Sequence, residues 1–381
     1  MGDKMIKILF FIETLSGGGA EKVLCNLVNN MDRQKFDITV QTLWPAEAEK
    51  YLAPDVRYKS VYKKRSRLNN LLYRLDAALG LTYKKHIRDG YDIECAYLET
   101  GATKIMAAST DRRAKKLAWV HCDLSKKVGD VRAFVKKSAG LYKAFDKVVC
   151  VSGAVRDSFV NMFGNEPPAV VIHNTIDDGE IRRKAVTYER LENTRPIVVS
   201  VGRLSVEKRF DRLLKAHKML IDRGIEHELW ILGEGPERPG LEAYIKENAI
   251  EGSAKLLGFT DNPYPVIAAA DMTVCSSDYE GMSTAAIESL ILGVPVVTTD
   301  CTGMRELFGD NECGIITDMS AEALAEGLLG LLTDKNLLKA YAEKAAERGK
   351  CFSARASARL TEEFFEELLN DNGVTAEKDG K

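Results

Sequence analysis

The chain has 381 residues, 45% hydrophobic and 29% charged, which is ordinary for a globular protein and excludes a disordered or fibrous one. One hydrophobic core rarely supports this length, so we expect two domains. The net charge of −2 conceals an asymmetry, because residues 1–180 carry 29 basic and 22 acidic side chains whereas residues 181–381 carry 25 and 34.

The first half of the chain alternates strand-like runs with helical stretches. The strand-like runs are 7–12, 36–40, 117–120, 148–151 and 170–172. The N-terminus enters the first run without a signal peptide, and no stretch reaches the roughly 18 apolar residues that cross a bilayer. We therefore expect a soluble, cytoplasmic protein.

A glycine-rich turn, residues 16–21, follows the first strand and opens a helix. Gly18 and Gly19 would let the backbone approach a phosphate or sugar, beside the unpaired N–H groups of the helix, although a plain tight turn is the alternative. A dinucleotide fingerprint would need glycine or alanine where Lys22 stands, and no acidic residue clearly ends the second strand.

The basic excess lies between Arg57 and Lys147, where 22 basic residues face 9 acidic ones. Such a surface can meet nucleic acid, anionic lipid or a phosphorylated acceptor, or it can be a solvated lysine-rich face. Within it, the basic segment 62–67 precedes a helical stripe made of Leu68, Leu71, Leu72, Leu75, Ala78 and Leu79. The stripe suits either an anionic membrane surface or the core of the domain.

His121 directly follows the strand at 117–120. Ligands of open α/β sheets bind beyond the carboxyl ends of the strands, so the position suits a functional residue, and a structural histidine is the alternative. Further along, residues 177–196 are polar, carry no clear strand and end at a proline, which predicts a linker there.

A second series of strand-like runs follows the linker, at 197–201, 229–232, 272–275 and 294–298. Two such series predict an α/β protein with two Rossmann-like, doubly wound parallel-sheet domains, over residues 1–180 and 181–352. We expect a last helix over 353–370 that packs back toward the N-terminal domain, and a disordered tail over 371–381.

Charged residues follow two strands of this second series. Arg203 and Lys208 come after the strand at 197–201, where they can neutralise a diphosphate or form a simple surface pair. Glu280 lies in the turn after the strand at 272–275, and Glu288 lies two turns into the next helix. The amides at the start of that helix would hold a phosphate, and they belong to Gly281, Met282, Ser283 and Thr284.

The eight cysteines include no Cys-x-x-Cys pair, which argues against a zinc site or a disulfide framework. We expect them to be reduced and mostly buried. No Asp-x-Asp metal motif follows a strand either.

Taken together, these motifs resemble glycosyltransferase family 4, in order and spacing, from about residue 5 to about residue 370. The matching elements are Gly18 to Glu21, Gly202 to Leu204 with Lys208, Glu280 with Glu288, and Gly293 to Val297 followed by Thr302, Gly303 and Glu306. The resemblance implies a GT-B fold, with the two domains facing across a cleft, and transfer of a sugar from a nucleotide-diphosphate donor with retention.

The resemblance also assigns roles by position. It implies that Arg203 and Lys208 grip the donor diphosphate, that Glu288 binds the nucleotide ribose, and that Glu280 meets the donor sugar. His121 would contact that sugar from the opposite domain. Backbone contacts to the donor or acceptor would come from Gly18, Gly19 and the turn at 302–304, and the base would lie near 233–235, Gly258 and Phe259.

No metal or other cofactor is expected, because cationic side chains and helix termini can stabilise the leaving diphosphate. The resemblance favours UDP over GDP and a saccharide or a polyisoprenyl-diphosphate-linked saccharide as acceptor, at the inner face of the cell membrane in cell-surface polysaccharide synthesis. Nucleic acid is not an expected partner, whereas anionic membrane is.

Two residues depart from the family pattern, because Arg209 and Thr302 stand where glycine is usual. Either could alter diphosphate binding or merely crowd its loop. The alternatives from other classes are a nicotinamide-dependent dehydrogenase, which lacks its glycine fingerprint here, and a catalytically silent subunit, which would be expected to lose the four charged donor-site residues.

Overall fold

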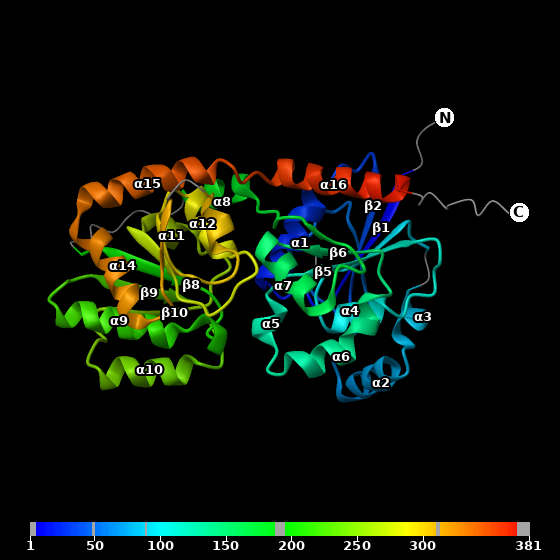
Figure 1. The fold of residues 1–381 in the computed structure, drawn as a ribbon, viewed down its shortest axis with the longest axis horizontal. Helices are drawn as coiled ribbons and strands as arrows, with labels where there is room; N and C mark the ends of the chain where they lie inside the picture. Colours follow the sequence, from blue (N-terminus) through cyan, green and yellow to red (C-terminus); the bar gives the residue numbers. More distant parts are fainter. Residues whose placement is uncertain (1–4, 48–49, 88–89, 187–194, 310–312, 372–381) are drawn as a thin grey trace, which may run out of the picture.

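The computed structural model describes residues 5–47, 50–87, 90–186, 195–309 and 313–371, and it forms two lobes, each around a parallel sheet (Figure 1). The N-terminal sheet has the order β3-β2-β1-β4-β5-β6-β7 and the C-terminal sheet the order β10-β9-β8-β11-β12-β13. The first sheet comprises β1 (Ile6–Ile12), β2 (Phe36–Thr42), β3 (Arg57–Ser60), β4 (Ile93–Ala96), β5 (Lys115–Val120), β6 (Lys147–Cys150) and β7 (Ala169–Val171). The second comprises β8 (Ile197–Val201), β9 (Glu228–Leu232), β10 (Ala254–Gly258), β11 (Met272–Cys275), β12 (Val296–Thr299) and β13 (Gly314–Thr317).

Every predicted run overlaps a strand, and the prediction of two doubly wound parallel sheets is confirmed. The strands that the sequence analysis missed are β3, β4, β10 and β13. In β4 the apolar pattern is interrupted by Glu94, which is buried and accepts hydrogen bonds from Tyr83 Oη and, at 2.7 Å, from Ser109 Oγ. β3 is a polar edge strand, so it has no apolar pattern to recognise.

Helices cover both faces of each sheet. Those of the N-terminal lobe are α1 (Gly19–Asn30), α2 (Arg67–Ala78), α3 (Thr82–His86), α4 (Gly101–Met106), α5 (Leu124–Lys127), α6 (Val131–Tyr142) and α7 (Gly153–Phe163). Those that follow are α8 (Asp178–Ala185), η2 (Val206–Lys208), α9 (Phe210–Asp222), α10 (Arg238–Glu247), α11 (Tyr264–Ala269), α12 (Thr284–Ile291), α13 (Met304–Phe308), α14 (Ala321–Thr333), α15 (Lys335–Gly349) and α16 (Ala354–Asn370).

Part of the predicted linker is a helix rather than an irregular segment. α8 begins at Asp178, and the carboxylate of the preceding Asp177 accepts a hydrogen bond from the Glu180 amide at 2.7 Å. Acidic residues in its first turn and basic residues in its last turn complement the helix dipole. α8 contacts α11 and α12 of the C-terminal lobe, and the rest of the predicted linker, apart from residues 186, 195 and 196, lies outside the described residues.

The last helix, α16, returns to the N-terminal lobe and packs on α1 (Figure 1). Phe365 of α16 is fully buried, with its ring centroid 6.1 Å from that of Phe10 on β1 and 6.3 Å from that of Trp119 on β5. The last helix thus contributes a side chain to the core of the first lobe. Apart from Asp371, the tail expected over 371–381 lies outside the described residues.

The leucine stripe of α2 faces solvent, which excludes the core as one of the two alternatives for it. Leu68, Leu71 and Leu75 are 65%, 55% and 52% exposed.

None of the described helices combines the length and the apolar character needed to cross a bilayer. All eight cysteines are free thiols, and only Cys351 is exposed.

A buried histidine pair packs inside the C-terminal lobe. His227 Nδ1 lies 2.9 Å from the Ile225 carbonyl oxygen, so this nitrogen must carry the proton and Nε2 must accept. His217 Nδ1, 2.8 Å from His227 Nε2, therefore donates, and His217 Nε2 accepts from Ser253 Oγ at 2.9 Å. Burial lowers the pKa of both histidines, which favours this neutral pair.

This pair predicts acid sensitivity of the C-terminal lobe. Because the folded pKa values lie below the unfolded value of about 6.5, the pair's stabilisation is present above that pH and is lost as pH falls below it. We expect the free energy of unfolding to fall by on the order of 1–2 kcal/mol from this source between pH 7 and pH 5. Urea unfolding of wild type and His217→Gln across that range should give a shallower pH dependence in the variant; equal slopes would contradict the assignment.

Candidate active site

Lys208 and Glu280 form an ion pair at the carboxyl ends of β8 and β11. Lys208 ends the 3₁₀ helix η2, and Glu280 lies in the turn between β11 and α12. Lys208 Nζ lies 2.6 Å from Glu280 Oε1, which also accepts a hydrogen bond from Ser277 Oγ at 2.7 Å. Burial alone would lower the pKa of Lys208, but the carboxylate of Glu280 outweighs burial and leaves that pKa raised. The structure thus places two of the predicted site residues in direct contact.

The residue after Lys208 has a left-handed backbone conformation. Arg209 has φ 50° and ψ 44°, which glycine adopts more readily than other residues. Its guanidinium donates to Asp211 at 2.9 Å and to Asp278 at 3.2 Å, and the buried Arg212 donates to the same Asp278 at 2.6 Å. These ion pairs hold an arginine in a turn where the family pattern has glycine, so this departure preserves the turn.

Arg203 does not join the Lys208 ion pair. Its side chain is exposed and makes no ion pair within the part of the chain that the structure describes. The backbone around it packs closely on the turn after β9, because a Cβ atom at Gly233 would lie 1.9 Å from the Gly202 carbonyl oxygen. This contact therefore has no room for a side chain at position 233. The Arg203 side chain lies outside it, in solvent.

Gly258 and Phe259 lie beside that same turn. Gly258 has φ +80°, and its carbonyl oxygen accepts a hydrogen bond from the Gly233 amide at 2.8 Å. The ring of Phe259 next to it is 62% exposed. The carboxyl ends of β8, β9 and β10 thus form a backbone-lined edge with one aromatic side chain at its rim.

Glu288, on α12, has a partner that the sequence analysis did not foresee. Its buried carboxylate accepts a hydrogen bond through Oε1 from Lys22 Nζ of the N-terminal lobe, at 2.7 Å. The same ammonium lies 4.7 Å from the ring centroid of Tyr264. Lys22 entered the sequence analysis only as the residue that breaks a dinucleotide fingerprint, although its place in the first turn of α1 marked it as near the site.

The glycine-rich turn is folded by Glu21, which reaches back from α1. The Glu21 carboxylate accepts hydrogen bonds from the Gly18 amide at 2.9 Å and from the Ser16 amide. Gly19 faces α12 of the other lobe, since a Cβ atom there would lie 3.6 Å from Thr284 Oγ1. The turn therefore meets the start of α12, where Ser283 is the N-cap and accepts from the Ala286 amide.

His121 lies at the end of β5 above a buried carboxylate. Both of its ring nitrogens are buried and make no hydrogen bond of ordinary geometry within the described structure, and burial lowers its pKa to about 4. Its amide donates to Glu99 at 3.1 Å, and Lys127 Nζ lies 2.8 Å from the other Glu99 oxygen. Burial would raise the pKa of Glu99, but Lys127 outweighs burial and lowers it to about 2.

The two lobes meet at Gly281 without room for a side chain. A Cβ atom at Gly281 would lie 1.9 Å from the His121 carbonyl oxygen, and the Gly281 carbonyl oxygen accepts from Ser152 Oγ at 2.9 Å. The Met282 carbonyl oxygen next to it accepts from Asn174 Nδ2 at 3.1 Å. His121 and the start of α12, predicted separately, are therefore brought together.

Thr302, the second departure from the family pattern, also bridges the lobes. Its hydroxyl donates to Asp123 Oδ2 at 3.0 Å, whereas Asp123 Oδ1 accepts from Ser125 Oγ at 2.6 Å and from Ser158 Oγ at 2.5 Å. A threonine here supplies a hydrogen bond that glycine could not.

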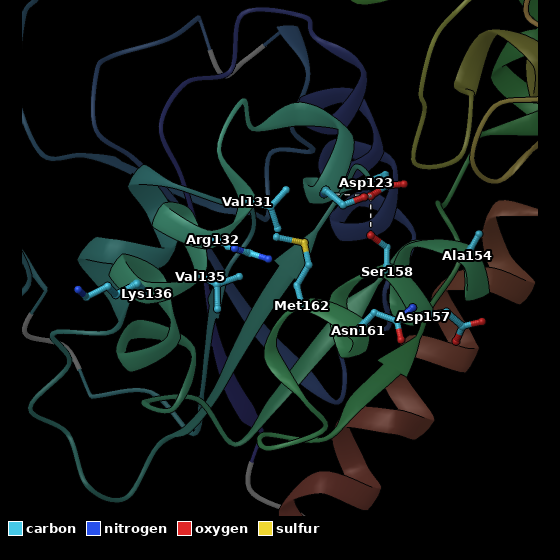
Figure 2. A pocket seen from close by; sticks show the side chains of 11 residues that line it. Asp123, Val131, Arg132, Val135, Lys136, Ala154, Asp157, Ser158, Asn161 and Met162 are labelled. Atoms are coloured by element: carbon cyan, nitrogen blue, oxygen red, sulfur yellow. Dashed lines mark hydrogen bonds between the residues drawn. The ribbon is translucent and has the colours of Figure 1, made fainter.

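A hollow of about 680 Å³ opens beside Asp123, between α5, α6 and α7. Figure 2 shows Arg132 extending toward Met162 and Val135 within it, while Lys136 points outward at its rim. Arg132 and Lys136 form no ion pair among the described residues, and the carboxylates of Asp123 and Asp157 line the same hollow. Sequence reasoning missed it because its walls come from three separate helices.

No cluster of three or more His, Cys, Asp or Glu side chains suited to a metal ion occurs among the described residues. The predicted residues fall into two groups that face each other. His121, Gly18 and Gly19 belong to the N-terminal lobe, and the others line the C-terminal lobe.

Family profiles match nearly the whole chain. The profile of group 1 glycosyl transferases matches residues 182–348, and that of glycosyltransferase family 4 matches residues 17–180. The chain is 31% identical over 365 residues to the N-acetylgalactosamine-N,N'-diacetylbacillosaminyl-diphospho-undecaprenol 4-alpha-N-acetylgalactosaminyltransferase of Campylobacter jejuni, covering 93% of this chain and 98% of that protein. It is 25% identical to the amylovoran biosynthesis glycosyltransferase AmsD of Erwinia amylovora, covering 96% and 100%.

Solved structures share the fold at lower sequence identity. HepE of Anabaena, solved with UDP and glucose, superposes with a TM-score of 0.76 at 20% identity, covering 95% of this chain and 99% of that one. A TarM mutant of S. aureus, solved with UDP among its ligands, superposes with a TM-score of 0.77 at 16% identity, covering 96% and 100%. The expected GT-B fold is confirmed.

Gly281→Ala tests the contact between the lobes. The added methyl group would meet the His121 backbone at 1.9 Å, so the lobes must separate locally. We expect a cost on the order of 2 kcal/mol, seen as a melting temperature lower by several degrees, and a larger radius of gyration in small-angle X-ray scattering. Gly240→Ala on α10, where a Cβ atom meets nothing within 4 Å, is the matched control and should be neutral or stabilising. Identical behaviour of the two variants would refute the contact.

Proposed function

The chain belongs to the family 4 glycosyltransferases, and on that premise we propose a retaining enzyme that moves a hexose or N-acetylhexosamine from a nucleotide-diphosphate sugar to a saccharide or lipid-linked saccharide. Its relatives act in bacterial polysaccharide synthesis. The observation that carries the proposal is the Lys208–Glu280 ion pair beside the start of α12, with His121 in contact from the other lobe.

The donor diphosphate is proposed to lie between Lys208 and the first amides of α12. Lys208 supplies a point charge, and Arg203, which has no ion pair among the described residues, can supply a bidentate fork. Gly281 and Ser283 stand at the N-terminal end of α12, where the helix dipole favours negative charge. UDP is the proposed nucleotide, supported by the UDP in two structural relatives.

The nucleoside is proposed to occupy the edge formed by β9 and β10. Glu288 would bind the ribose, and the base would lie along the backbone of Gly258 with the exposed ring of Phe259 beside it. Gly19 faces Thr284 at the start of α12, and together with the adjacent Gly18 it would close on the diphosphate or the acceptor.

The proposed reaction needs charge stabilisation rather than a protein nucleophile. The bond from the sugar's anomeric carbon to the diphosphate breaks, the acceptor hydroxyl oxygen bonds to that carbon from the same face, and its proton passes to the departing diphosphate. Lys208 and the α12 amides stabilise the charge that grows on the diphosphate, which supports metal independence. His121, with a pKa of about 4, is neutral at pH 7 and would hydrogen-bond a sugar hydroxyl, as would Glu280.

The acceptor is proposed to approach along the N-terminal lobe. The hollow beside Asp123 has apolar side chains and two cations, Arg132 and Lys136, that can bind a phosphate group of a saccharide (Figure 2). Its two carboxylates, Asp123 and Asp157, can accept hydrogen bonds from sugar hydroxyls. The Campylobacter relative acts on a diphospho-undecaprenol-linked saccharide, which supports a lipid-linked acceptor here.

A lipid-linked acceptor would bring the enzyme to the inner face of the membrane, and α2 is the proposed contact. The exposed leucines of this helix, Leu68, Leu71 and Leu75 among them, are preceded by the exposed Lys63 and Lys64. Apolar side chains beside cations fit a bilayer of anionic lipid, which accepts the leucines between its headgroups and attracts the lysines.

Incubation with a panel of UDP- and GDP-sugars in EDTA tests the enzymatic proposal, with release of nucleoside diphosphate as the readout. Wild type should turn over one donor, while Glu280→Ala and Lys208→Ala should lose on the order of 10²–10³-fold in rate because the diphosphate loses its counter-charge or its positioned partner. Lys246→Ala, an exposed lysine on α10, is the matched control and should keep full rate.

The other outcomes of this panel distinguish the proposed enzyme from its alternatives. Turnover that requires added divalent metal would contradict metal independence. Neither turnover nor nucleotide binding would favour the silent-subunit alternative. Nucleotide binding without turnover would direct the search to the acceptor.

Co-sedimentation with vesicles tests the membrane contact. Wild type should bind vesicles containing phosphatidylglycerol and release them at high salt, whereas a Leu71→Glu/Leu75→Glu variant should lose at least about tenfold in binding because charged side chains do not enter the bilayer. Leu360→Glu replaces an equally exposed leucine on α16 as the control. Equal binding of both variants, or no binding by wild type, would count against α2.

A further inference from the structure

Lys22 reaches across the lobes to the residue proposed to read the nucleotide ribose. It lies in the first turn of α1, three residues after Gly19, and its Nζ lies 2.7 Å from Glu288 Oε1. The Glu288 side chain is 5% exposed and that of Lys22 32% exposed. Among the described residues no other cation pairs with Glu288, so this contact alone balances its charge.

A carboxylate buried to this extent is stable in its charged form only when it is paired. Without Lys22, the Glu288 carboxylate would be buried with no cation beside it and would be free to turn away from its present orientation. With Lys22 on Oε1, the second oxygen, Oε2, makes no hydrogen bond to a described residue. The ion pair therefore fixes the orientation of the carboxylate and leaves Oε2 available as an acceptor.

The ammonium of Lys22 has two contacts in the other lobe. Its Nζ lies 4.7 Å from the ring centroid of Tyr264 on α11, and it donates a hydrogen bond to Glu288 on α12. Both helices belong to the C-terminal lobe, whereas Lys22 belongs to the N-terminal lobe. The geometry exists only while the lobes are in contact.

We propose that Lys22 is a positioning residue for ribose recognition: from the opposite lobe it balances the charge of Glu288 and fixes its orientation, so that the ribose hydroxyls are read fully only by the closed enzyme. The inference rests on the proposed function, in which Glu288 binds the ribose. It adds a residue from the acceptor lobe to the selection of the donor. A contact that merely joined the lobes would affect stability but not the choice between ribose and deoxyribose.

Calorimetric titration separates these two roles. Wild type, Lys22→Met and Lys22→Arg are titrated with UDP, 2′-deoxy-UDP and 3′-deoxy-UDP, or with the guanosine series if the donor panel selects GDP. Wild type should bind the ribonucleotide on the order of 10- to 100-fold more tightly than at least one deoxynucleotide, since a hydroxyl donates to a charged acceptor. Lys22→Met should reduce that ratio to about threefold or less, and Lys22→Arg should largely keep it.

Lys35→Met is the matched control, because Lys35 pairs with Glu366 at 2.8 Å on the surface of the same lobe, away from the site. It should keep the full ribose preference. A Lys22→Met protein that melts lower but discriminates like wild type would overturn the inference. A wild type that binds UDP without preferring ribose would overturn it too, whereas a wild type that binds neither UDP nor GDP would refute the proposed function first, and the inference with it.

Discussion

The backbone contact between Gly281 and His121 is the constraint on which the site depends. A Cβ atom at position 281 would overlap the His121 carbonyl oxygen. The carboxyl ends of the two sheets can therefore approach each other here only because this residue is glycine. The contact puts the start of α12 beside the end of β5. As a result, groups that belong to different lobes, and to strands far apart in the chain, meet at one contact.

Three ion pairs taken partly out of water lie within and between the two lobes. Glu99 with Lys127 lies in the N-terminal lobe, Lys208 with Glu280 lies in the C-terminal lobe, and a third pair joins the two. Pairing of this kind rarely adds stability, because desolvation of both charges offsets most of their attraction. Its value here is to keep charged groups fixed in place before a substrate arrives, so that little reorganisation remains for the reaction itself.

Local sequence patterns predicted most of the strands and several of the site residues. Apolar runs located the strands, and the rule that ligands bind beyond strand ends drew attention to Lys208 and Glu280. β4 was missed because the buried Glu94 breaks its apolar pattern. Glu99, which follows β4, was therefore not recognised as a residue at a strand end. The partner of Glu288 could not be found this way, since Lys22 is 266 residues away and nothing local links the two. Pairings across the lobes are set by how the domains dock, which neither periodicity nor spacing records.

The return of α16 has a consequence for synthesis on the ribosome. The core around Phe10 and Trp119 is closed by Phe365, which is made only after every strand of the second lobe. N-terminal domains generally fold first as the chain emerges, at roughly 5–20 residues per second. Here the first lobe must wait for the second to be completed, with an apolar gap on β1 and β5 open to chaperones and to aggregation throughout. The two lobes therefore mature as one unit, although each has its own sheet.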